Sequence, residues 1–84
     1  MTRHYVYVVE CADGSLYTGW TTDVEKRIAA HNTGRGAKYT RSRCPVALKL
    51  VESYEDKSQA LKREVEIKRM QRREKQRLID RYEQ

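Results

Sequence analysis

The first twenty residues carry the hydrophobic pattern of a β-hairpin. Residues 4–9 and 16–20 are rich in β-branched and aromatic side chains, and the turn-forming segment 12–15 separates them. Such side chains favour the pleated surface of a sheet, whereas an Asp-Gly pair favours a tight turn. The pattern therefore predicts two antiparallel strands joined around Asp13 and Gly14.

The length of this turn decides which tyrosines share a face of the sheet. A two-residue loop places Tyr7 and Tyr17 on opposite faces, because a shift of one residue turns each side chain to the other face. A three-residue loop over residues 13–15 pairs Val9 with Gly19 and places both tyrosines on one face. The hydrophobic pattern alone permits both registers.

The pattern then changes to that of a helix. Thr22 and Glu25 have the spacing of a capping box, so a helix is expected to begin at Thr22. The segment 32–34, Asn-Thr-Gly, is a stop signal. One side of this helix carries two apolar residues with two polar residues beside them, namely Val24, Ile28, Arg27 and His31.

Residues 33–44 contain two glycines, four cations, one tyrosine and no acid. This composition predicts a flexible basic loop, which Pro45 closes. Cations interleaved with an aromatic ring suit phosphate contacts combined with stacking on a base or sugar, although a charged run in a loop is more often simply solvated. The candidate nucleic-acid contacts are Arg35, Lys38, Tyr39, Arg41 and Arg43.

The second half of the chain predicts one strand and two helices. Residues 46–54 have strand composition, and residues 56–58 offer a helix start for a helix over about 57–70. Residues 71–74 indicate a short break or a helix restart. A terminal helix follows, and its inner stripe consists of Leu78, Ile79 and Tyr82.

One carboxylate of the 57–70 helix is expected to point inward. At 100° per residue, Glu64 falls at the centre of the apolar face, whereas Glu66 falls on the far side. An inward carboxylate favours a metal ion or a buried partner. The alternative is an i,i+4 ion pair with Lys68 at the surface. The apolar face consists of Ala60, Leu61, Val65 and Ile67.

Composition limits the size and class of the protein. Eighty-four residues form one small domain, 1–84, with a thin core and a shallow site, which excludes a two-domain enzyme. Eighteen Lys and Arg against twelve Asp and Glu give a net charge of +6. Residues 1–56 hold 8 basic and 7 acidic side chains, whereas residues 57–84 hold 10 and 5. This asymmetry predicts a polyanionic partner, such as nucleic acid or an anionic membrane surface.

The sequence predicts a cytoplasmic protein. Apolar stretches are too short for a membrane span, and no basic and apolar leader indicates export. Cys11 and Cys44 are far apart and have no pair of histidines beside them. Two reduced thiols are therefore expected, rather than a disulfide framework or a zinc site.

Several residues with chemical potential follow one another in order, namely Tyr5-Val6-Tyr7, Tyr17-Thr18-Gly19, Arg27, His31, the basic glycine loop and Glu64. This ordered set resembles the GIY-YIG nuclease family, particularly its small stand-alone bacterial members, over residues 4–81. The resemblance implies an α+β fold, with a three-stranded, mostly antiparallel sheet flanked by helices in the order ββαβαα. It also implies cleavage of DNA phosphodiester bonds with one divalent metal ion, usually Mg²⁺, with Mn²⁺ as another candidate.

The resemblance also implies a role for each residue. Tyr7 and Tyr17 match the paired family tyrosines, and Tyr7 is expected to activate the attacking water or hydroxyl. Arg27 matches the arginine that steadies the scissile phosphate, and His31 matches a histidine that bonds the tyrosines or the phosphate. Glu64 matches the sole carboxylate ligand of the metal. We therefore predict that Tyr7 and Tyr17 share one face of the hairpin.

The expected chemistry makes one electrostatic demand on the site. A phenol has a pKa of about 10 and is a poor base at neutral pH, so nearby positive charge is expected to lower the pKa of Tyr7.

Two features depart from the family pattern. Tyr5 replaces the leading glycine of the first triplet, and Asn32 is the only asparagine, so a later family asparagine has no counterpart.

Three functions are compatible with these observations. The leading one is a metal-dependent DNA endonuclease acting on structured or damaged DNA in repair or recombination, alone or with a protein partner. The second is a non-catalytic nucleic-acid-binding protein that retains the fold. The third is a basic adaptor for an acidic protein, which makes no use of Tyr7, Tyr17 or Glu64. For the two tyrosines, plain packing in a strand is the simpler alternative to catalysis.

Overall fold

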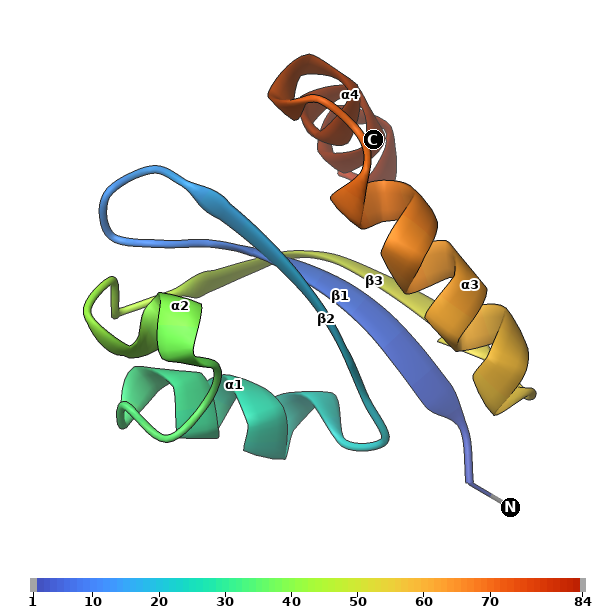
Figure 1. Cartoon of the computed structure of the whole chain (residues 1–84), viewed down its shortest axis with the longest axis horizontal. Coiled ribbons are helices and arrows are strands. Elements are labelled where there is room, and N and C mark those ends of the chain that lie inside the picture. Colours follow the sequence, from blue (N-terminus) through green and yellow to red (C-terminus); the bar gives the residue numbers. More distant parts are fainter. Residues whose placement is uncertain (1, 84) are drawn as a thin grey trace.

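The structure, a computed structural model, describes residues 2–83 and has the predicted α+β fold (Figure 1). A three-stranded antiparallel sheet has the strand order β2-β1-β3. The order ββαβαα is confirmed, with one additional short helix, α2, in the segment expected to be a loop. The elements are β1 (His4–Glu10), β2 (Leu16–Thr21), α1 (Val24–Asn32), α2 (Lys38–Arg41), β3 (Ala47–Tyr54), α3 (Lys57–Lys68) and α4 (Arg72–Tyr82).

The central strand β1 is buried on both faces and divides the core into two parts. Val6 and Val8 belong to a cluster on the side of α3 and α4, whereas Tyr7 and Val9 belong to a cluster on the other side, where α1 and α2 lie (Figure 1). A central strand covered by helices on both faces can be apolar at successive positions. The other buried members are Leu50, Ala60, Ile67 and Ile79 in the first cluster and Cys11 and Val46 in the second.

The hairpin turn has three residues, but they are 12–14 rather than the predicted 13–15. The backbone N–H of Cys11 donates to the carbonyl of Ser15 at 2.8 Å, so these two residues close the ladder. Gly14 has a φ of +85°, a conformation that glycine adopts without strain. The Asp13 carboxylate accepts from the N–H and the hydroxyl of Ser15, which holds Ser15 at the start of the second strand rather than in the loop.

This turn corrects the predicted register while preserving the predicted face. Val9 lies opposite Tyr17, not opposite Gly19 or Thr18, and Tyr7 lies opposite Gly19. Relative to the predicted three-residue loop the register shifts by two residues, and a shift of two leaves every side chain on its face. The prediction that Tyr7 and Tyr17 share one face is therefore confirmed.

The start of α1 differs from the predicted capping box. Asp23, not Thr22, is the N-cap, and its carboxylate accepts from the backbone N–H of Lys26 at 3.1 Å. Glu25 therefore lies in the first turn, where a negative charge is favourable beside the helix N-terminus. The predicted end is confirmed, because α1 ends at Asn32.

The basic segment is partly helical, which corrects the prediction of a loop over all of 33–44. Helix α2 is a short turn in which the N–H of Thr40 donates to the carbonyl of Ala37 at 3.1 Å. Thr40 is fully buried, so this segment packs against the rest of the fold. The side chain of Asn32 bonds both the N–H and the carbonyl of Val46, which fixes the end of α1 beside the start of β3.

The inward face of α3 is narrower than predicted. Ala60 and Ile67 are buried as expected, but Leu61 and Val65 are 37% and 45% exposed. The face that contacts the sheet is centred between Ala60 and Ile67, where Arg63 and Glu64 are half-buried, so Leu61 and Val65 lie at its edge. In α4, Ile79 is buried and Leu78 packs against the core, whereas Tyr82 is 53% exposed and is not part of the inner stripe.

Two further observations concern the cysteines and the helices of residues 2–83. Both cysteines are free thiols, with Cys11 buried and Cys44 partly exposed. In this part of the chain, no helix combines the length and apolar character that crossing a membrane requires.

Candidate active site

The hydroxyl of Tyr7 is the meeting point of the candidate site. Tyr7 is fully buried, and its Oη lies 2.8 Å from Nε2 of His31. The Nε–H of Arg27 also donates to this oxygen, at a longer distance of 3.4 Å. Tyr7 comes from β1 and the other two residues from one side of α1, so three of the four predicted catalytic residues are joined by hydrogen bonds at this hydroxyl.

Gly19 of β2 makes room for the ring of Tyr7. A Cβ atom at position 19 would lie 2.6 Å from Cζ of Tyr7 and still closer to its hydroxyl oxygen. Because real Cβ atoms do not approach other atoms so closely, any side chain here must displace the ring. The absence of a side chain at Gly19 therefore allows the Tyr7 hydroxyl to lie against the edge strand.

Gly19→Ala is expected to destabilise the fold by about 1–3 kcal/mol, because overpacking in a filled core forces side chains out of position. Chemical denaturation of the variant and the wild type measures this loss. In the Tyr7→Phe background the same substitution is expected to cost less, since the hydroxyl nearest the new Cβ is gone. An unchanged free energy of unfolding for Gly19→Ala alone would contradict this packing.

His31 is enclosed on all sides by the site. Its Nδ1 lies 2.7 Å from Oγ1 of Thr40, and the rings of Tyr7 and Tyr17 meet its ring edge-on at centroid distances of 5.7 and 5.5 Å. Burial lowers the pKa of His31, and the charge of Arg27 lowers it further. His31 is therefore a neutral imidazole at pH 7, with one nitrogen that donates and one that accepts.

The electrostatics of Tyr7 differ from the sequence expectation. Burial raises the pKa of Tyr7, and although the hydrogen bond and charge of Arg27 lower it, the net direction is upward. Tyr17 and Glu64 also raise the pKa of Tyr7. The expected lowering is therefore wrong, because loss of hydration outweighs the single neighbouring cation. Among these causes the charge of Glu64 is the smallest.

Glu64 is turned inward, as predicted, although it also makes the alternative ion pair. Its side chain is 17% exposed, and Oε2 lies 3.6 Å from Nζ of Lys68. Within residues 2–83 there is no group of three or more His, Cys, Asp and Glu side chains that could hold a metal ion. A single carboxylate nevertheless fits Mg²⁺, which prefers oxygen ligands, keeps several waters and binds through one or two carboxylates.

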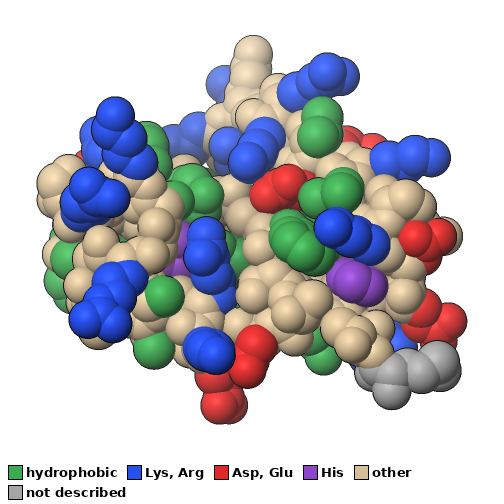
Figure 2. Space-filling view, turned by 60° about the horizontal axis from the view of Figure 1, so that its bottom comes forward, with side chains coloured by type: hydrophobic (Ala, Val, Ile, Leu, Met, Phe, Trp, Pro, Cys, Tyr) green, Lys and Arg blue, Asp and Glu red, His purple; other side chains and the backbone are tan. Residues whose placement is uncertain are grey.

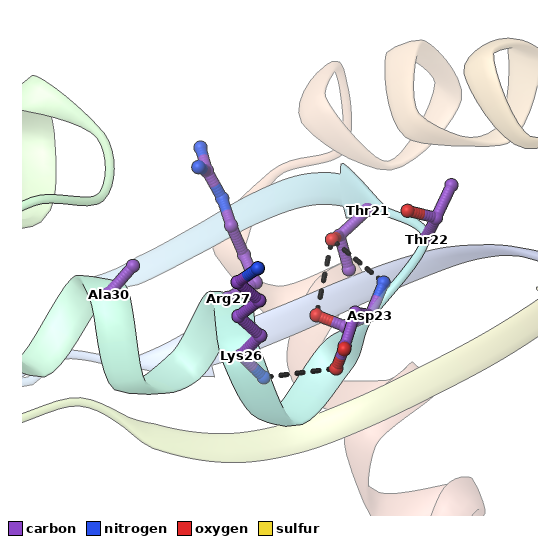
Figure 3. A pocket seen from close by; sticks show the side chains of 6 residues that line it. All are labelled: Thr21, Thr22, Asp23, Lys26, Arg27 and Ala30. Carbon is purple, nitrogen blue, oxygen red and sulfur yellow. Dashed lines mark hydrogen bonds between the residues drawn. The ribbon is translucent and has the colours of Figure 1, made fainter.

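An open pocket of about 270 Å³ lies beside Arg27, and Lys26 and Thr21 are among its lining residues. In Figure 3 the side chain of Arg27 extends away from α1, whereas Thr21 and Asp23 are joined by hydrogen bonds at the start of the helix. The carboxylate of Asp23 is occupied by the N–H of Lys26. Within residues 2–83, neither Lys26 nor Arg27 forms an ion pair with an acid, and the guanidinium of Arg27 bonds only the hydroxyl of Tyr7.

The predicted nucleic-acid contacts divide into two groups. Arg35, Lys38 and Arg41 are exposed, and none of them forms an ion pair with an acid of residues 2–83. Figure 2 shows Lys and Arg side chains gathered on the left of the molecule, the side on which α2 lies. Arg43 and Tyr39, by contrast, are engaged within the fold.

Arg43 and Tyr39 form part of the support of the site. Arg43 pairs with Asp13 at 3.0 Å and lies 4.1 Å from the centre of the Tyr39 ring. Tyr39 stacks on Tyr17 with a centroid distance of 5.8 Å. These contacts link the hairpin turn, α2 and β2, and they leave Tyr39 only 40% exposed.

Sequence reasoning missed two residues that hold His31. Thr40 contacts its Nδ1, and Gly36 lies so close that a Cβ there would be 2.7 Å from Cγ of His31. Both belong to the segment that was expected to be a flexible loop. The signal in the sequence was weak. A basic segment that packs a threonine and a glycine against the core has the same composition as a basic segment that is mobile.

The comparisons with known proteins identify the family of the chain. A model of the GIY-YIG catalytic domain matches residues 3–77. The chain belongs to the GIY-YIG nuclease family. That domain implies a nuclease whose substrate is DNA.

Two curated relatives match this family member along nearly their whole length. A UPF0213 protein of Staphylococcus haemolyticus is 55% identical over 80 residues, which are 95% of this chain and 98% of the relative. A UPF0213 protein of Halobacterium salinarum is 56% identical over 76 residues, 90% of this chain and 99% of the relative.

Two solution NMR structures have the same fold. A UPF0213 protein from Bacillus halodurans has a TM-score of 0.62 and 49% identity, over 93% of this chain and 83% of that chain. A protein from E. faecalis has a TM-score of 0.66 and 40% identity, over 99% of this chain and 88% of that chain.

Proposed function

We propose that this protein is a metal-dependent DNA endonuclease that hydrolyses phosphodiester bonds. The observation that carries the proposal is the contact of two groups, His31 and Arg27, with the Tyr7 hydroxyl. The half-buried carboxylate of Glu64 on α3 is the candidate metal ligand. Plain packing of a tyrosine in a strand needs none of these groups, whereas hydrolysis needs a proton acceptor, a phosphate-binding cation and a metal ligand.

Tyr7 and His31 together supply the proton acceptor. The attacking water or hydroxyl gives its proton to Oη of Tyr7 while Tyr7 gives its own proton to Nε2 of His31, 2.8 Å away. Because His31 is neutral, it can accept this proton. The transfer avoids a free buried phenolate, which the raised pKa of Tyr7 disfavours.

Arg27 has two positions in the proposed reaction. In the structure it bonds the hydroxyl of Tyr7, which has no exposed surface. Binding of the scissile phosphate draws the guanidinium outward, toward the pocket beside Lys26, and opens the hydroxyl to the attacking water. Side-chain movements of this kind are common when a partner binds.

Glu64 would hold the divalent ion, Mg²⁺ or Mn²⁺, through its half-buried carboxylate. When bound, the ion supplies positive charge against the negative charge that develops on the phosphoryl oxygens. Arg27 acts on the same charge from α1.

The proposed target is structured or damaged DNA, in repair or recombination. Arg35, Lys38 and Arg41 suit contacts to phosphates, and phosphate contacts position a protein without reading sequence. Selectivity then falls on the shape of the DNA. The pocket beside Arg27 is open, which suits a strand held away from a regular duplex.

The test is incubation of the protein with nicked, flapped, branched and plain duplex DNA in the presence of Mg²⁺ or Mn²⁺. We expect cleavage that requires the metal ion and is lost in Glu64→Ala. At least one of the structured DNAs should be cut faster than the plain duplex. Cleavage that persists after chelation of the metal, or in Glu64→Ala, contradicts the proposed mechanism.

DNA binding is expected to weaken steeply with salt, because each Lys or Arg at a phosphate releases a counterion. Lys38→Gln and Arg41→Gln should each reduce the slope of log K against log salt by about 1. Lys62→Gln removes the same charge from the exposed face of α3 and should leave the slope unchanged. Fluorescence anisotropy measures these slopes, and a flat response in the wild type would overturn the predicted interface.

A non-catalytic DNA-binding function is the second candidate. The full burial and raised pKa of Tyr7 favour it, because a protonated and covered phenol is not ready to act as a base. This candidate predicts salt-sensitive binding without cleavage of any DNA in the same panel.

A further inference from the structure

A buried chain of hydrogen-bonding groups runs from Tyr7 through His31 to α2. Tyr7, His31 and Thr40 have no exposed surface. Tyr7 Oη lies 2.8 Å from Nε2 of His31, and Thr40 Oγ1 lies 2.7 Å from Nδ1. Thr40 Oγ1 also lies 3.0 Å from the carbonyl oxygen of Ala37. The chain therefore has a phenol at one end and a backbone carbonyl at the other.

Each hydrogen bond in this series of buried groups can be assigned a donor and an acceptor. The carbonyl of Ala37 can only accept, so the hydroxyl of Thr40 must donate to it. That hydroxyl then has no second hydrogen, and it must accept from Nδ1–H of His31. Since a neutral imidazole carries one proton, Nε2 keeps a free lone pair and accepts from the hydroxyl of Tyr7.

The opposite tautomer, with the proton on Nε2, leaves a more deeply buried group unsatisfied. Thr40 would donate to Nδ1 instead of to the carbonyl of Ala37, which keeps the N–H of Thr40 as its donor. The buried hydroxyl of Tyr7 would meet an N–H and lose its acceptor on His31, and an unsatisfied buried hydroxyl is costly. The only gain is an acceptor for the N–H of Ala37, which lies 3.4 Å from Nδ1. This long contact does not replace the short bond of the fully buried Tyr7 hydroxyl.

We propose that Thr40 is a positioning residue that fixes His31 in the Nδ1–H tautomer, with Nε2 ready to accept the proton of Tyr7. Its consequence for catalysis rests on the proposed nuclease function, whereas the tautomer itself does not. Gly36 assists, because the ring of His31 occupies the space that a Cβ at position 36 would fill. Thr40 never meets DNA, yet it sets the direction in which the proton moves.

The test is nitrogen NMR of the imidazole rings in ¹⁵N-labelled protein, which reports the nitrogen that carries the proton. Signals of His31 are separated from those of His4 with the variant His4→Gln. Thr40→Val removes the hydroxyl at nearly constant volume, whereas Thr40→Ser keeps it. We expect the Nδ1–H tautomer in the wild type and in Thr40→Ser, and a shift toward the Nε2–H tautomer in Thr40→Val.

Cleavage provides the second readout. Thr40→Val is expected to slow metal-dependent cleavage about ten- to a hundredfold with unchanged DNA affinity, and Thr40→Ser is expected to restore most of the rate. An Nε2–H tautomer in the wild type overturns the proposal, even if Thr40→Val fails to fold. Retention of the Nδ1–H tautomer in a folded Thr40→Val overturns it equally.

The two proposals fail in different ways. If the wild type cuts no DNA while its His31 has the Nδ1–H tautomer that Thr40→Val removes, the nuclease proposal fails and the role of Thr40 in fixing the ring stands. If the wild type cuts DNA with His31 in the Nε2–H tautomer, the role of Thr40 fails and the nuclease proposal stands.

Discussion

Glu64→Gln is expected to abolish DNA cleavage, with a loss of about 10²–10⁴-fold, while DNA affinity stays equal or rises slightly. The loss follows from removal of the proposed metal ligand, since a bound ion contributes several kcal/mol of charge stabilisation. Affinity is expected to hold because a negative charge near the phosphates disappears. Fold stability should change by only a few tenths of a kcal/mol, because the pair with Lys68 is long and its lysine is half exposed.

Two control variants separate the metal-binding role from the ion pair. Lys68→Gln removes the partner of Glu64 and leaves the carboxylate, so cleavage should persist. Glu66→Gln removes the same charge from the exposed side of α3, where Glu66 pairs with Arg63. Nicking rates and DNA affinities of the three variants are compared at fixed salt and Mg²⁺. Retained nicking in Glu64→Gln would end the assignment of Glu64 as the metal ligand.

Tyr7→Phe is expected to slow cleavage by about 10²–10⁴-fold, the usual contribution of a positioned acid–base group. DNA affinity should not change, because Tyr7 has no exposed surface. The fold should lose about 1–3 kcal/mol, because Nε2 of His31 is left in a buried site without its donor. Single-turnover cleavage and chemical denaturation measure the two effects.

Tyr17→Phe is the matched control for Tyr7→Phe. Tyr17 lies on the same face and contacts the ring of His31, but its side chain is only half-buried. The hydroxyl of Tyr17 is therefore expected to contribute less to stability. If Tyr17→Phe loses cleavage and Tyr7→Phe keeps it, the proton acceptor is Tyr17 and the proposed transfer through His31 is wrong.

The sequence predicted the frame of the fold because its signals are local. The β-branched and aromatic composition of β1 and β2, the Asp-Gly turn and the stop after Asn32 depend on neighbouring residues. The common face of Tyr7 and Tyr17 was predicted from the family resemblance, because the hydrophobic pattern alone permits both an even and an odd register. The register itself could not be predicted, because the sequence does not show whether Ser15 lies in the turn or just after it.

The parts that could not be predicted depend on distant contacts. The burial of Thr40 follows from its packing against His31, and nothing in the composition of the basic segment indicates it. The raised pKa of Tyr7 follows from the depth of its burial, which no helical or strand period reports. Leu61 and Val65 are exposed because the sheet meets only a narrow part of α3.

The division of the core by β1 has a consequence for the protein while it is being synthesised and folded. Tyr7 and His31 belong to one side of the sheet, whereas Glu64 is carried by a helix that packs on the other. During synthesis the two sides cannot act together until β3 and α3 have left the ribosome and docked. A nascent or partly unfolded copy of the proposed nuclease keeps its positive charge but lacks a complete centre. It can therefore bind nucleic acid without cutting it, and only the fully folded protein can cleave DNA.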